Sequence, residues 1–307
     1  MADSLERVLK LVFLLVALVA GLLLQRLRSD ERVRDLIWIT SFWLVIPVLV
    51  FATFLSFPLD RRLLLALAAA IVSTWTLLAL AYLYSRLVSR ERDEKGALTL
   101  AGGIGNTGFI GYPLAQLVFG RHGLSQAVVY DQLSFGVPMT SISVVVARLF
   151  GRRSVDTEGR SRLAVVLLNP PLWALVAALL LRGAGVHIPY IRTVEDVAAA
   201  VVGPMGFLML GISLPLEQVE HDLREVARAT GAMALKIGGG PLVLFALGTA
   251  FGAHIPPVFY LLAAMPPAFH LLTIARVYDM RPALMRLMVV AATIPVVVGV
   301  VIGSFIF

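Results

Sequence analysis

Long runs of apolar residues, separated by short polar segments, fill almost the whole of the 307-residue chain. Each run is about 18 to 25 residues long, the length that an α-helix needs to cross the roughly 30 Å hydrocarbon core of a bilayer. The pattern therefore predicts an all-α integral membrane protein. It predicts ten transmembrane helices, at about Val8–Gln25, Val33–Leu55, Leu63–Leu87, Gly96–Phe119, Ser125–Leu149, Leu163–Leu181, Val194–Leu214, Thr230–Gly252, Pro257–Tyr278 and Ala283–Ile306.

Composition supports this prediction. Hydrophobic residues make up 59% of the chain and charged residues 15%, a balance that a soluble domain of this size cannot cover with polar surface. The first 25 residues look like a signal peptide, with Arg7 and Lys10 before an apolar core. No small-residue cleavage site follows, so we keep this segment as the first span.

The spans divide into two groups of five. The longest polar connection, Gly151–Ser161, separates residues 1–149 from residues 163–307, so that residues 150–162 form a short linker. Two pairs of prolines recur at a spacing of 157 residues, and they are Pro47 with Pro204 and Pro138 with Pro295. Helix-breaking residues also recur, at Gly105–Pro113 in span 4 and about 160 residues later at Met265–Pro267 in span 9. Because five is odd, the second half must insert upside down, as in the inverted repeats of secondary transporters.

Basic residues orient the chain. Loops after the odd-numbered spans hold 18 Lys and Arg residues, against 7 on the opposite side with the termini included. This bias places the odd-numbered loops in the cytoplasm and both termini outside. The net charge of +7 is thereby explained by loops that border the membrane, and no nucleic-acid partner is expected. A polar piece, Glu217–Arg228, is expected to form a solvated or interfacial helix, with Leu223 and Val226 touching the headgroups.

The interruption of span 4 is the strongest candidate site. Broken backbone at mid-membrane is tolerated only against protein or a water-filled cavity. Asn106 or Thr107 is expected to cap a second half-helix that starts near Phe109, with Pro113 in its first turn. The free N–H groups there favour an anionic group. The alternative is a glycine-rich helix packed tightly on a neighbour, with Pro113 as a kink, which explains Gly105, Gly108 and Gly111 but not Asn106.

Span 9 offers a second break. Pro266 and Pro267 remove two successive N–H donors and free upstream carbonyls, and His270 and Thr273 follow one turn apart. Either His270 relays a proton or meets an anion, or it is a buried histidine that bonds a freed carbonyl. In span 6, Asn169-Pro170-Pro171 is interpreted as a helix start near one membrane face.

Ionisable residues inside the spans are few. Asp131 and Gln132 lie about two turns into span 5, and helical spacing places Asp131 on one face with Ser134, Pro138 and Ser141. For Asp131 four roles stay open: a coupling-ion site, a proton acceptor, a counter-ion to Lys236, or an interfacial residue that reaches the headgroups. Lys236 is expected to extend outward to the interface, and Glu195 and Asp196 are interpreted as interfacial.

Other chemistry is not indicated. The sequence has no HExxH zinc motif, no GxSxG nucleophile elbow, no Walker motif, no paired carboxylates in adjacent spans and no Cys. We therefore expect no enzyme, no bound metal and no cofactor. Two rival readings are a sodium-coupled symporter and a channel or sensor, and a third, an intramembrane hydrolase, lacks a Ser-His or paired-Asp arrangement.

Four segments resemble the auxin efflux carrier family of membrane transporters, and the resemblance covers essentially the whole chain. They are GNTGFIGYPL at Gly105–Leu114, AVVYDQLSFG at Ala127–Gly136, NPPLWALV at Asn169–Val176 and PMGFLMLGISL at Pro204–Leu214. The resemblance implies the fold of bile-acid sodium symporters, with five plus five inverted helices and with helices 4 and 9 broken and crossing. It further implies a homodimeric scaffold of spans 1, 2, 6 and 7, and a transport part of spans 3–5 and 8–10 that moves like an elevator.

Carried over to this chain, the resemblance places the crossover asparagine at Asn106, the polar helix 5 position at Asp131 or Gln132, and the helix 9 crossover proline at Pro266 or Pro267. The long central loop of the plant auxin carriers is absent, which fits a bacterial member and argues against auxin itself as the solute.

The predicted function is therefore secondary-active transport of a small anionic organic solute, auxin-like or dicarboxylate-like, across a bacterial inner membrane. Asn106, Thr107 and the backbone of Gly105, Gly108 and Phe109–Gly111 are predicted to bind the solute. Pro266, Pro267 and His270 are predicted to complete the crossover, with Pro113 structural there. Asp131 and Gln132 are predicted to support the site, and Asp131, His270 and Lys236 are candidates for proton coupling.

Overall fold

The computed structural model describes residues 2–26, 31–153, 169–214 and 222–306. These residues form helices, and their only β-type pairing is an isolated bridge between Gly105 and Pro267. The linker at 154–162, the first part of predicted span 6 and the segment 215–221 lie outside the described residues. The α-helices are α1 (Ala2–Arg26), α2 (Glu31–Thr40), α3 (Ile46–Ser56), α4 (Arg61–Val88), α5 (Arg92–Gly103), α6 (Tyr112–Tyr130), α7 (Val137–Phe150), α9 (Pro170–Gly183), α10 (Ile191–Ser213), α11 (Leu223–Ala234), α12 (Gly240–Ala250), α13 (Pro257–Ala263), α14 (His270–Val277) and α15 (Pro282–Ile306).

Seven helical runs among the described residues are long and apolar enough to cross a membrane. They are Val8–Arg26, Asp35–Ser56, Arg61–Val88, Thr107–Phe150, Ile191–Ser213, Leu223–Ala250 and Pro282–Ser304. The 44-residue run Thr107–Phe150 bends back at Gly120, whose φ of 67° and ψ of −159° are not helical. An integral membrane protein built of helices is thus confirmed.

Four π-helical turns lie within these runs, and each ends just before a proline. They are η1 (Ser41–Val45), η2 (Thr107–Gly111), η3 (Asp131–Gly136) and η4 (Leu235–Gly239), and the prolines that follow are Pro47, Pro113, Pro138 and Pro241. A proline lacks an N–H and its ring clashes with the carbonyl four residues earlier. A wider turn before the proline accommodates both effects, as π-bulges do. Because η3 changes the helical register, the single face predicted for Asp131, Ser134, Pro138 and Ser141 does not follow from α-helical spacing.

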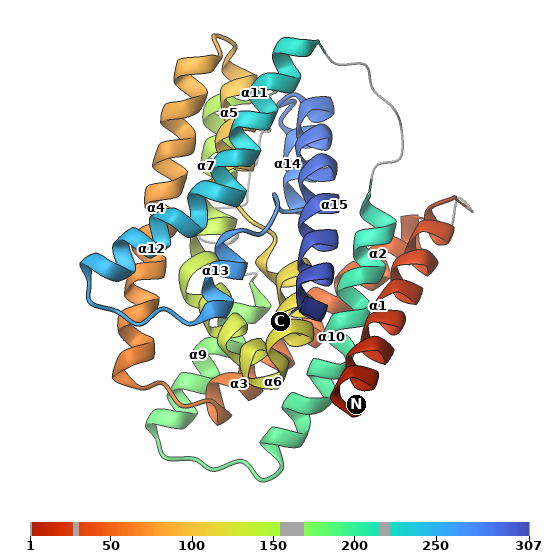
Figure 1. The fold of residues 1–307 in the computed structure, drawn as a ribbon, viewed down its shortest axis with the longest axis vertical. Coiled ribbons are helices and arrows are strands. Elements are labelled where there is room, and N and C mark those ends of the chain that lie inside the picture. Colours follow the sequence, from red (N-terminus) through yellow and green to blue (C-terminus); the bar gives the residue numbers. More distant parts are fainter. Residues whose placement is uncertain (1, 27–30, 154–168, 215–221, 307) are drawn as a thin grey trace.

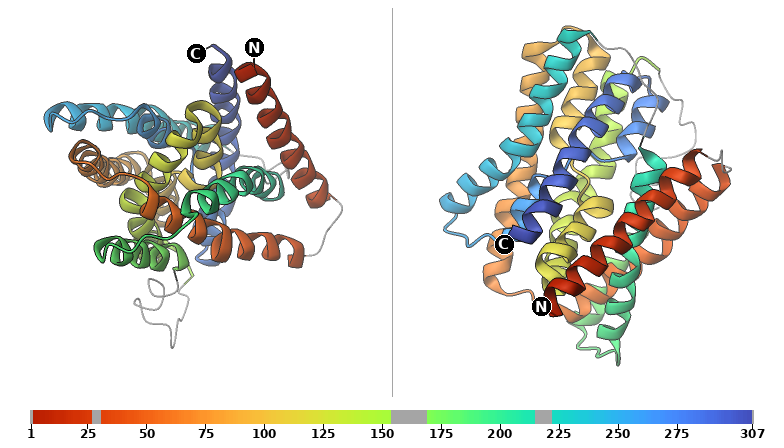
Figure 2. Two further views of the ribbon diagram at one scale, coloured as in Figure 1. Left: turned by 90° about the horizontal axis from the view of Figure 1, so that it is seen from below. Right: turned by 45° about the vertical axis from the view of Figure 1, so that its right-hand side comes forward.

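The helices pack in two groups. In Figures 1 and 2, α1, α2 and α10 lie together on one side of the molecule, and α4, α5, α7 and α11 on the other. The first group also includes α3 and α9, since α3 packs against both α9 and α10. In the second group α5 packs against α4, α7, α11 and α15.

Near the end of span 7 the structure corrects one boundary. We expected a separate polar helix up to Arg228 and a span that begins at Thr230. Instead α11, η4 and α12 follow one another without a break from Leu223 to Ala250. Leu223 is exposed and Val226 is partly so, as expected for residues that touch the headgroups, but they belong to the span itself.

Helices α1 and α10 approach each other at two facing glycines. A Cβ at Gly21 would lie 2.3 Å from the Leu208 carbonyl oxygen, and a Cβ at Gly211 would lie 2.3 Å from that of Leu18. Small residues let membrane helices pack this closely, because only their backbones meet.

Replacing Gly211 by Ala is expected to destabilise the protein by about 1–3 kcal/mol, since a methyl group has no room and the helices must separate. Thermal unfolding of the purified protein in detergent measures this change. The matched control is Gly299→Ala in α15, where a Cβ meets no atom within 4 Å. There the better helix propensity of Ala raises stability by about 0.5–1 kcal/mol. Equal melting temperatures for Gly211→Ala and the wild type would contradict the close packing.

Candidate functional site

The two predicted interruptions lie against each other. Helix α5 ends at Gly103 and η2 begins at Thr107, while α13 ends at Ala263 and α14 begins at His270. The Asn106 N–H donates to the Pro266 carbonyl at 2.7 Å, and the Ala268 N–H donates to the Ile104 carbonyl at 3.3 Å. Lipid offers no hydrogen bonds to an unwound backbone. Each broken helix therefore satisfies part of the other's backbone, which accounts for the bridge between Gly105 and Pro267.

Asn106 caps the second half-helix of span 4. Its side-chain Oδ1 accepts a hydrogen bond from the Phe109 N–H at 3.2 Å, and its backbone carbonyl accepts from the Gly111 N–H at 3.0 Å. The half-helix begins at Thr107, two residues earlier than expected, so Pro113 follows a full π-turn and does not lie in the first turn. Asn106 is 3% exposed, and its Nδ2 has no hydrogen-bond partner among the described residues.

The glycines of this segment differ in what surrounds them. A Cβ at Gly105 would lie 2.9 Å from Lys236 Cε, and one at Gly111 would lie 2.6 Å from Leu262 Cδ2. Tight packing thus explains these two residues. At Gly108 a Cβ would meet nothing within 4 Å, and Gly108 and Phe109 are the partly exposed residues of the turn. The N-terminal N–H groups of a helix lack intrahelical acceptors, so this is where a bound group can reach them.

Asp131 holds the start of the half-helix. The Thr107 hydroxyl donates to Asp131 Oδ1, while the Tyr112 hydroxyl and the Gln132 amide donate to Oδ2 at 2.6 and 3.0 Å. These four residues are buried. The interfacial reading of Asp131 is therefore wrong, and among the described residues Asp131 forms no direct ion pair with Lys236. Tyr112 was not singled out from the sequence, although it belongs to the GNTGFIGYPL segment.

We had expected Lys236 to extend outward to the interface, but the structure shows the opposite. The side chain is fully buried, and its Nζ donates to the Ala263 carbonyl at 2.6 Å. The same ammonium lies 5.8 Å from the centre of the Phe135 ring. The Ala263 carbonyl is available to Lys236 for a local reason. In a helix it would accept from an N–H three or four residues later, but Pro266 and Pro267 stand there and have no N–H.

His270 starts the half-helix α14. Its Nε2 is buried and has no hydrogen-bond partner among the described residues, so at this atom the structure does not show the expected bond to a freed carbonyl. Thr273, one turn later, is exposed. Both expected roles of His270, in proton relay and in anion contact, stay predictions.

A cavity of about 10 Å³ lies beside the crossover, lined by Thr74, Trp75, Leu78, Gly103, Ile104, Phe135 and Ile142. That volume is close to the room of one water molecule. A larger hollow of about 330 Å³ lies away from the break, lined by Phe119, His122, Gly123, Gln126, His254, Pro256 and Pro257. Asn106, whose side chain is 3% exposed, lines neither of these two hollows.

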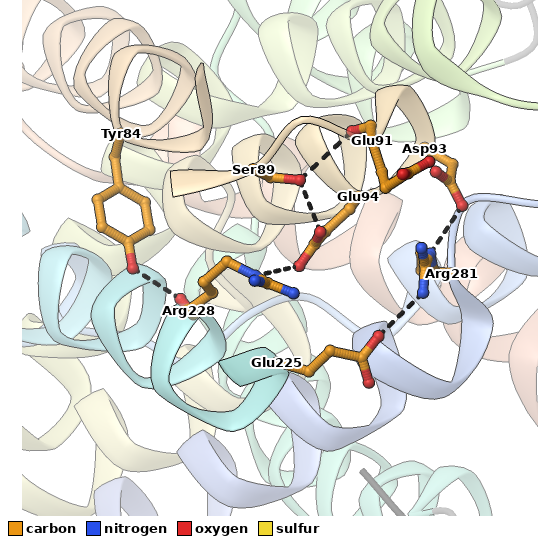
Figure 3. Close-up of polar contacts among 8 residues, drawn as sticks. All are labelled: Tyr84, Ser89, Glu91, Asp93, Glu94, Glu225, Arg228 and Arg281. Carbon is orange, nitrogen blue, oxygen red and sulfur yellow. Dashed lines mark hydrogen bonds and ion pairs between the residues drawn. The ribbon is translucent and has the colours of Figure 1, made fainter. Parts of the chain in front are cut away.

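A second polar cluster ties together the ends of α5, α11 and α15 (Figure 3). Asp93 and Glu94, in the first turn of α5, are buried and pair with Arg281 at 2.9 Å and Arg228 at 2.6 Å. Glu225 also pairs with Arg281 at 2.9 Å. Partial burial is the largest single cause and lowers the pKa of the Arg281 guanidinium. The attraction and hydrogen bond of Asp93, with the attraction of Glu225 and Glu94, together outweigh burial and raise that pKa. Sequence reasoning treated these arginines only as topology signals and missed their partners.

A third cluster surrounds Glu195, which we had placed at the interface with the headgroups. Glu195 is 4% exposed, so its carboxyl is bonded within the protein and does not reach the headgroups directly, whereas Asp196 is exposed. Glu195 Oε1 accepts hydrogen bonds from Ser125 at 2.7 Å and Thr53 at 3.2 Å. Glu195 Oε2 accepts from Ser56 at 2.6 Å and Arg121 at 3.2 Å. The carboxyl thus joins α3 and α10 to α6.

A family model described as membrane transport protein matches residues 5–158 and 159–302. The chain belongs to this family, that of the auxin efflux carriers. The resemblance drawn from GNTGFIGYPL and the other three segments is thereby confirmed, and the chain is a multi-pass membrane protein of a transporter family.

Two archaeal relatives of this auxin efflux carrier family member are similar to parts of the chain. An uncharacterized transporter of Methanothermobacter thermautotrophicus is 27% identical over 191 residues, which cover 62% of this chain and 60% of the relative. An uncharacterized transporter of Methanocaldococcus jannaschii is 33% identical over 141 residues, or 44% of each chain. Each match spans less than two thirds of the relative's length.

Proposed function

We propose that this protein is a secondary transporter that moves a small anionic organic solute across the membrane by alternating access. The observation that carries the proposal is Asn106. It is a buried residue that starts a half-helix inside the protein, and its Nδ2 donor has no partner among the described residues. A buried donor without a partner costs about 1–3 kcal/mol, which an acceptor on a solute offsets. The N–H groups of Thr107 and Gly108 add a preference for negative charge.

The ten spans form two inverted halves, residues 1–149 and 163–307, in this proposal. Spans 1, 2, 6 and 7 form a scaffold that dimerises, and spans 3–5 and 8–10 form the moving part. The packing supports this division, because α10 packs against α1 and α3, and α3 packs against α9, while the broken helices belong to the other group. At the boundary a Cβ on Gly206 of α10 would lie 2.2 Å from the Phe109 carbonyl oxygen, so the crossover lies directly against the scaffold.

Each candidate residue has a role in the proposal. Asn106, Thr107 and the backbone from Gly105 to Gly111 bind the solute, and Pro266, Pro267 and His270 form the opposite side. Asp131 and Gln132 position Thr107 and Tyr112 and do not need to touch the solute. Asn106 is 3% exposed in this conformation, so in this proposal the two parts move relative to each other before the solute reaches its side chain.

Transport into proteoliposomes tests the proposal. Radiolabelled malate, succinate and indole-3-acetate are offered to purified protein with and without proton and sodium gradients, and protein-free liposomes serve as the control. Saturable uptake of at least one carboxylate, and its exchange against the same unlabelled acid, is expected. Ionic conductance without saturable exchange would instead indicate a channel.

Orientation is tested separately. The proposal places the protein in a bacterial inner membrane with both termini outside the cytoplasm. A fluorescent protein fused to the C-terminus is therefore expected to stay dark when it must fold outside, and a bright cytoplasmic fusion would contradict this topology.

A further inference from the structure

We infer that the Lys236 ammonium is a built-in cation of the crossover, filling the position at which a free monovalent cation would bind the broken helix. This inference rests on the proposed transport function and deepens it, because it concerns the coupling ion of the same site. In transporters with discontinuous helices, unwound carbonyls and the C-terminal ends of half-helices are the usual ligands of a coupling cation.

The first step concerns the acceptor. Within a continued helix the Ala263 carbonyl would accept from the N–H three or four residues later, but those residues are Pro266 and Pro267. The preceding carbonyls have donors, since Ala264 N–H reaches Tyr260 and Leu261, and Met265 N–H reaches Leu262. Among the described residues, the Ala263 carbonyl takes its hydrogen bond from Lys236, at 2.6 Å.

The second step concerns the cation. Lys236 is fully buried, and its Nζ faces a carbonyl oxygen and the Phe135 ring, both of which attract positive charge. Among the described residues Lys236 forms no ion pair with a carboxylate, since Asp131 is bonded to Thr107, Tyr112 and Gln132. An oxygen ligand and a ring face without a counter-ion suit a cation of any kind, whether an ammonium or an alkali ion.

The third step concerns the fit. A Cβ at Gly105 would lie 2.9 Å from Lys236 Cε and 3.1 Å from its Nζ. The break of span 4, the break of span 9 and the π-turn η3 thus enclose the ammonium on three sides. Because the lysine is covalently held, no free cation enters, and the wild-type site has no use for Na⁺.

Lys236→Ala vacates the position and tests the inference without any solute. Its melting temperature in detergent is expected to fall by about 3 °C or more. Addition of about 100 mM n-propylammonium or NaCl, against choline chloride at equal ionic strength, is expected to recover at least about half of the loss. The wild type, and Lys10→Ala, which removes an exposed lysine, are expected not to respond to either salt.

Two further variants separate charge from packing and from hydrogen bonding. Lys236→Met fills the same space without charge and Lys236→Gln keeps an N–H donor, so both are expected to melt below the wild type and to ignore added cations. The inference is overturned if Lys236→Met or Lys236→Gln is as stable as the wild type, or if neither salt restores Lys236→Ala. If Lys236→Ala does not fold, Lys236→Met and Lys236→Gln still test the inference. A melting temperature equal to that of the wild type in either variant would show that the crossover needs no cation.

Uptake gives an independent arm. Carboxylate uptake by the wild type that requires Na⁺ would overturn the inference while leaving the proposed transport intact. If no carboxylate in the panel is taken up, the transport proposal fails, and the melting experiments still decide whether Lys236 is the cation of the crossover.

Discussion

Replacing Asn106 by Ala is expected to abolish carboxylate uptake while the protein remains abundant in the membrane. The change removes two functions of one side chain, the cap that accepts from the Phe109 N–H at 3.2 Å and the unpartnered Nδ2 donor. A hydrogen bond to a charged group contributes about 1.5–3 kcal/mol, and loss of a cap costs about 0.5–2 kcal/mol. The hydrogen bond alone corresponds to a loss of about 10- to 150-fold in binding of the solute, and loss of the cap adds disorder at the start of the half-helix. Initial uptake rates, normalised to the amount of reconstituted protein, measure the effect.

Two variants separate the cap from the solute contact. Asn106→Asp keeps the acceptor for the Phe109 N–H but replaces the Nδ2 donor by a carboxylate oxygen, so the cap is expected to remain and uptake to be lost. The matched control is Asn169→Ala, because Asn169 also caps a helix, accepting from the Leu172 N–H at 3.3 Å, but lies outside the crossover. Asn169→Ala is expected to lose stability and retain uptake. Wild-type uptake by Asn106→Ala at equal abundance would remove Asn106 from the site.

The broken helices could be predicted because their causes are local. Glycine, proline and a capping asparagine act on their own turn of the chain, so Gly105–Pro113 and Met265–Pro267 mark the breaks in the sequence itself. Even so, the half-helix starts two residues earlier than expected, because Asn106 caps it at Thr107. The π-turns before four prolines were not predicted, since hydrophobic periodicity cannot distinguish a wide turn from an ordinary one.

The partners of buried charges could not be predicted, because they come from distant parts of the chain. Lys236 bonds a carbonyl 27 residues away, and Glu195 accepts from Ser125, 70 residues away. From the sequence alone, a charged residue near the end of a span has water and headgroups as its simplest partners. Only the packing of the spans shows that these two side chains face freed carbonyls and hydroxyls instead.

Glu195 gives the second prediction with a large effect, because it lies where the two proposed parts meet. It belongs to span 7 of the proposed scaffold, with Thr53 of span 2, while Ser125 belongs to span 5 of the proposed moving part. The hydroxyls of Thr53 and Ser125 both donate to Glu195 Oε1, at 3.2 and 2.7 Å. A movement of one part along the other must break the bond to Ser125 and the ion pair of Arg121 with Glu195, which measures 3.2 Å.

Cross-linking Thr53→Cys to Ser125→Cys is therefore expected to stop carboxylate uptake. The chain has no native Cys, so Hg²⁺ or a short bis-methanethiosulfonate joins only the two introduced thiols. The expected loss is at least about tenfold, because a covalent bridge between α3 and α6 holds closed a contact that the proposed movement must open. Removal of the bridge with excess thiol is expected to restore the rate. Uptake before cross-linking serves as the internal reference.

The matched control joins two positions within the proposed moving part. The hydroxyls of Ser85 in α4 and Thr99 in α5 lie 3.0 Å apart, so Ser85→Cys with Thr99→Cys offers a pair of comparable reach. Its cross-link is expected to leave uptake within about twofold of the untreated rate, since α4 and α5 move together in the proposal. Full uptake by the Thr53–Ser125 cross-link would show that α3 and α6 do not move apart during transport. Loss of uptake with both cross-links would contradict a rigid moving part and favour rearrangement within it.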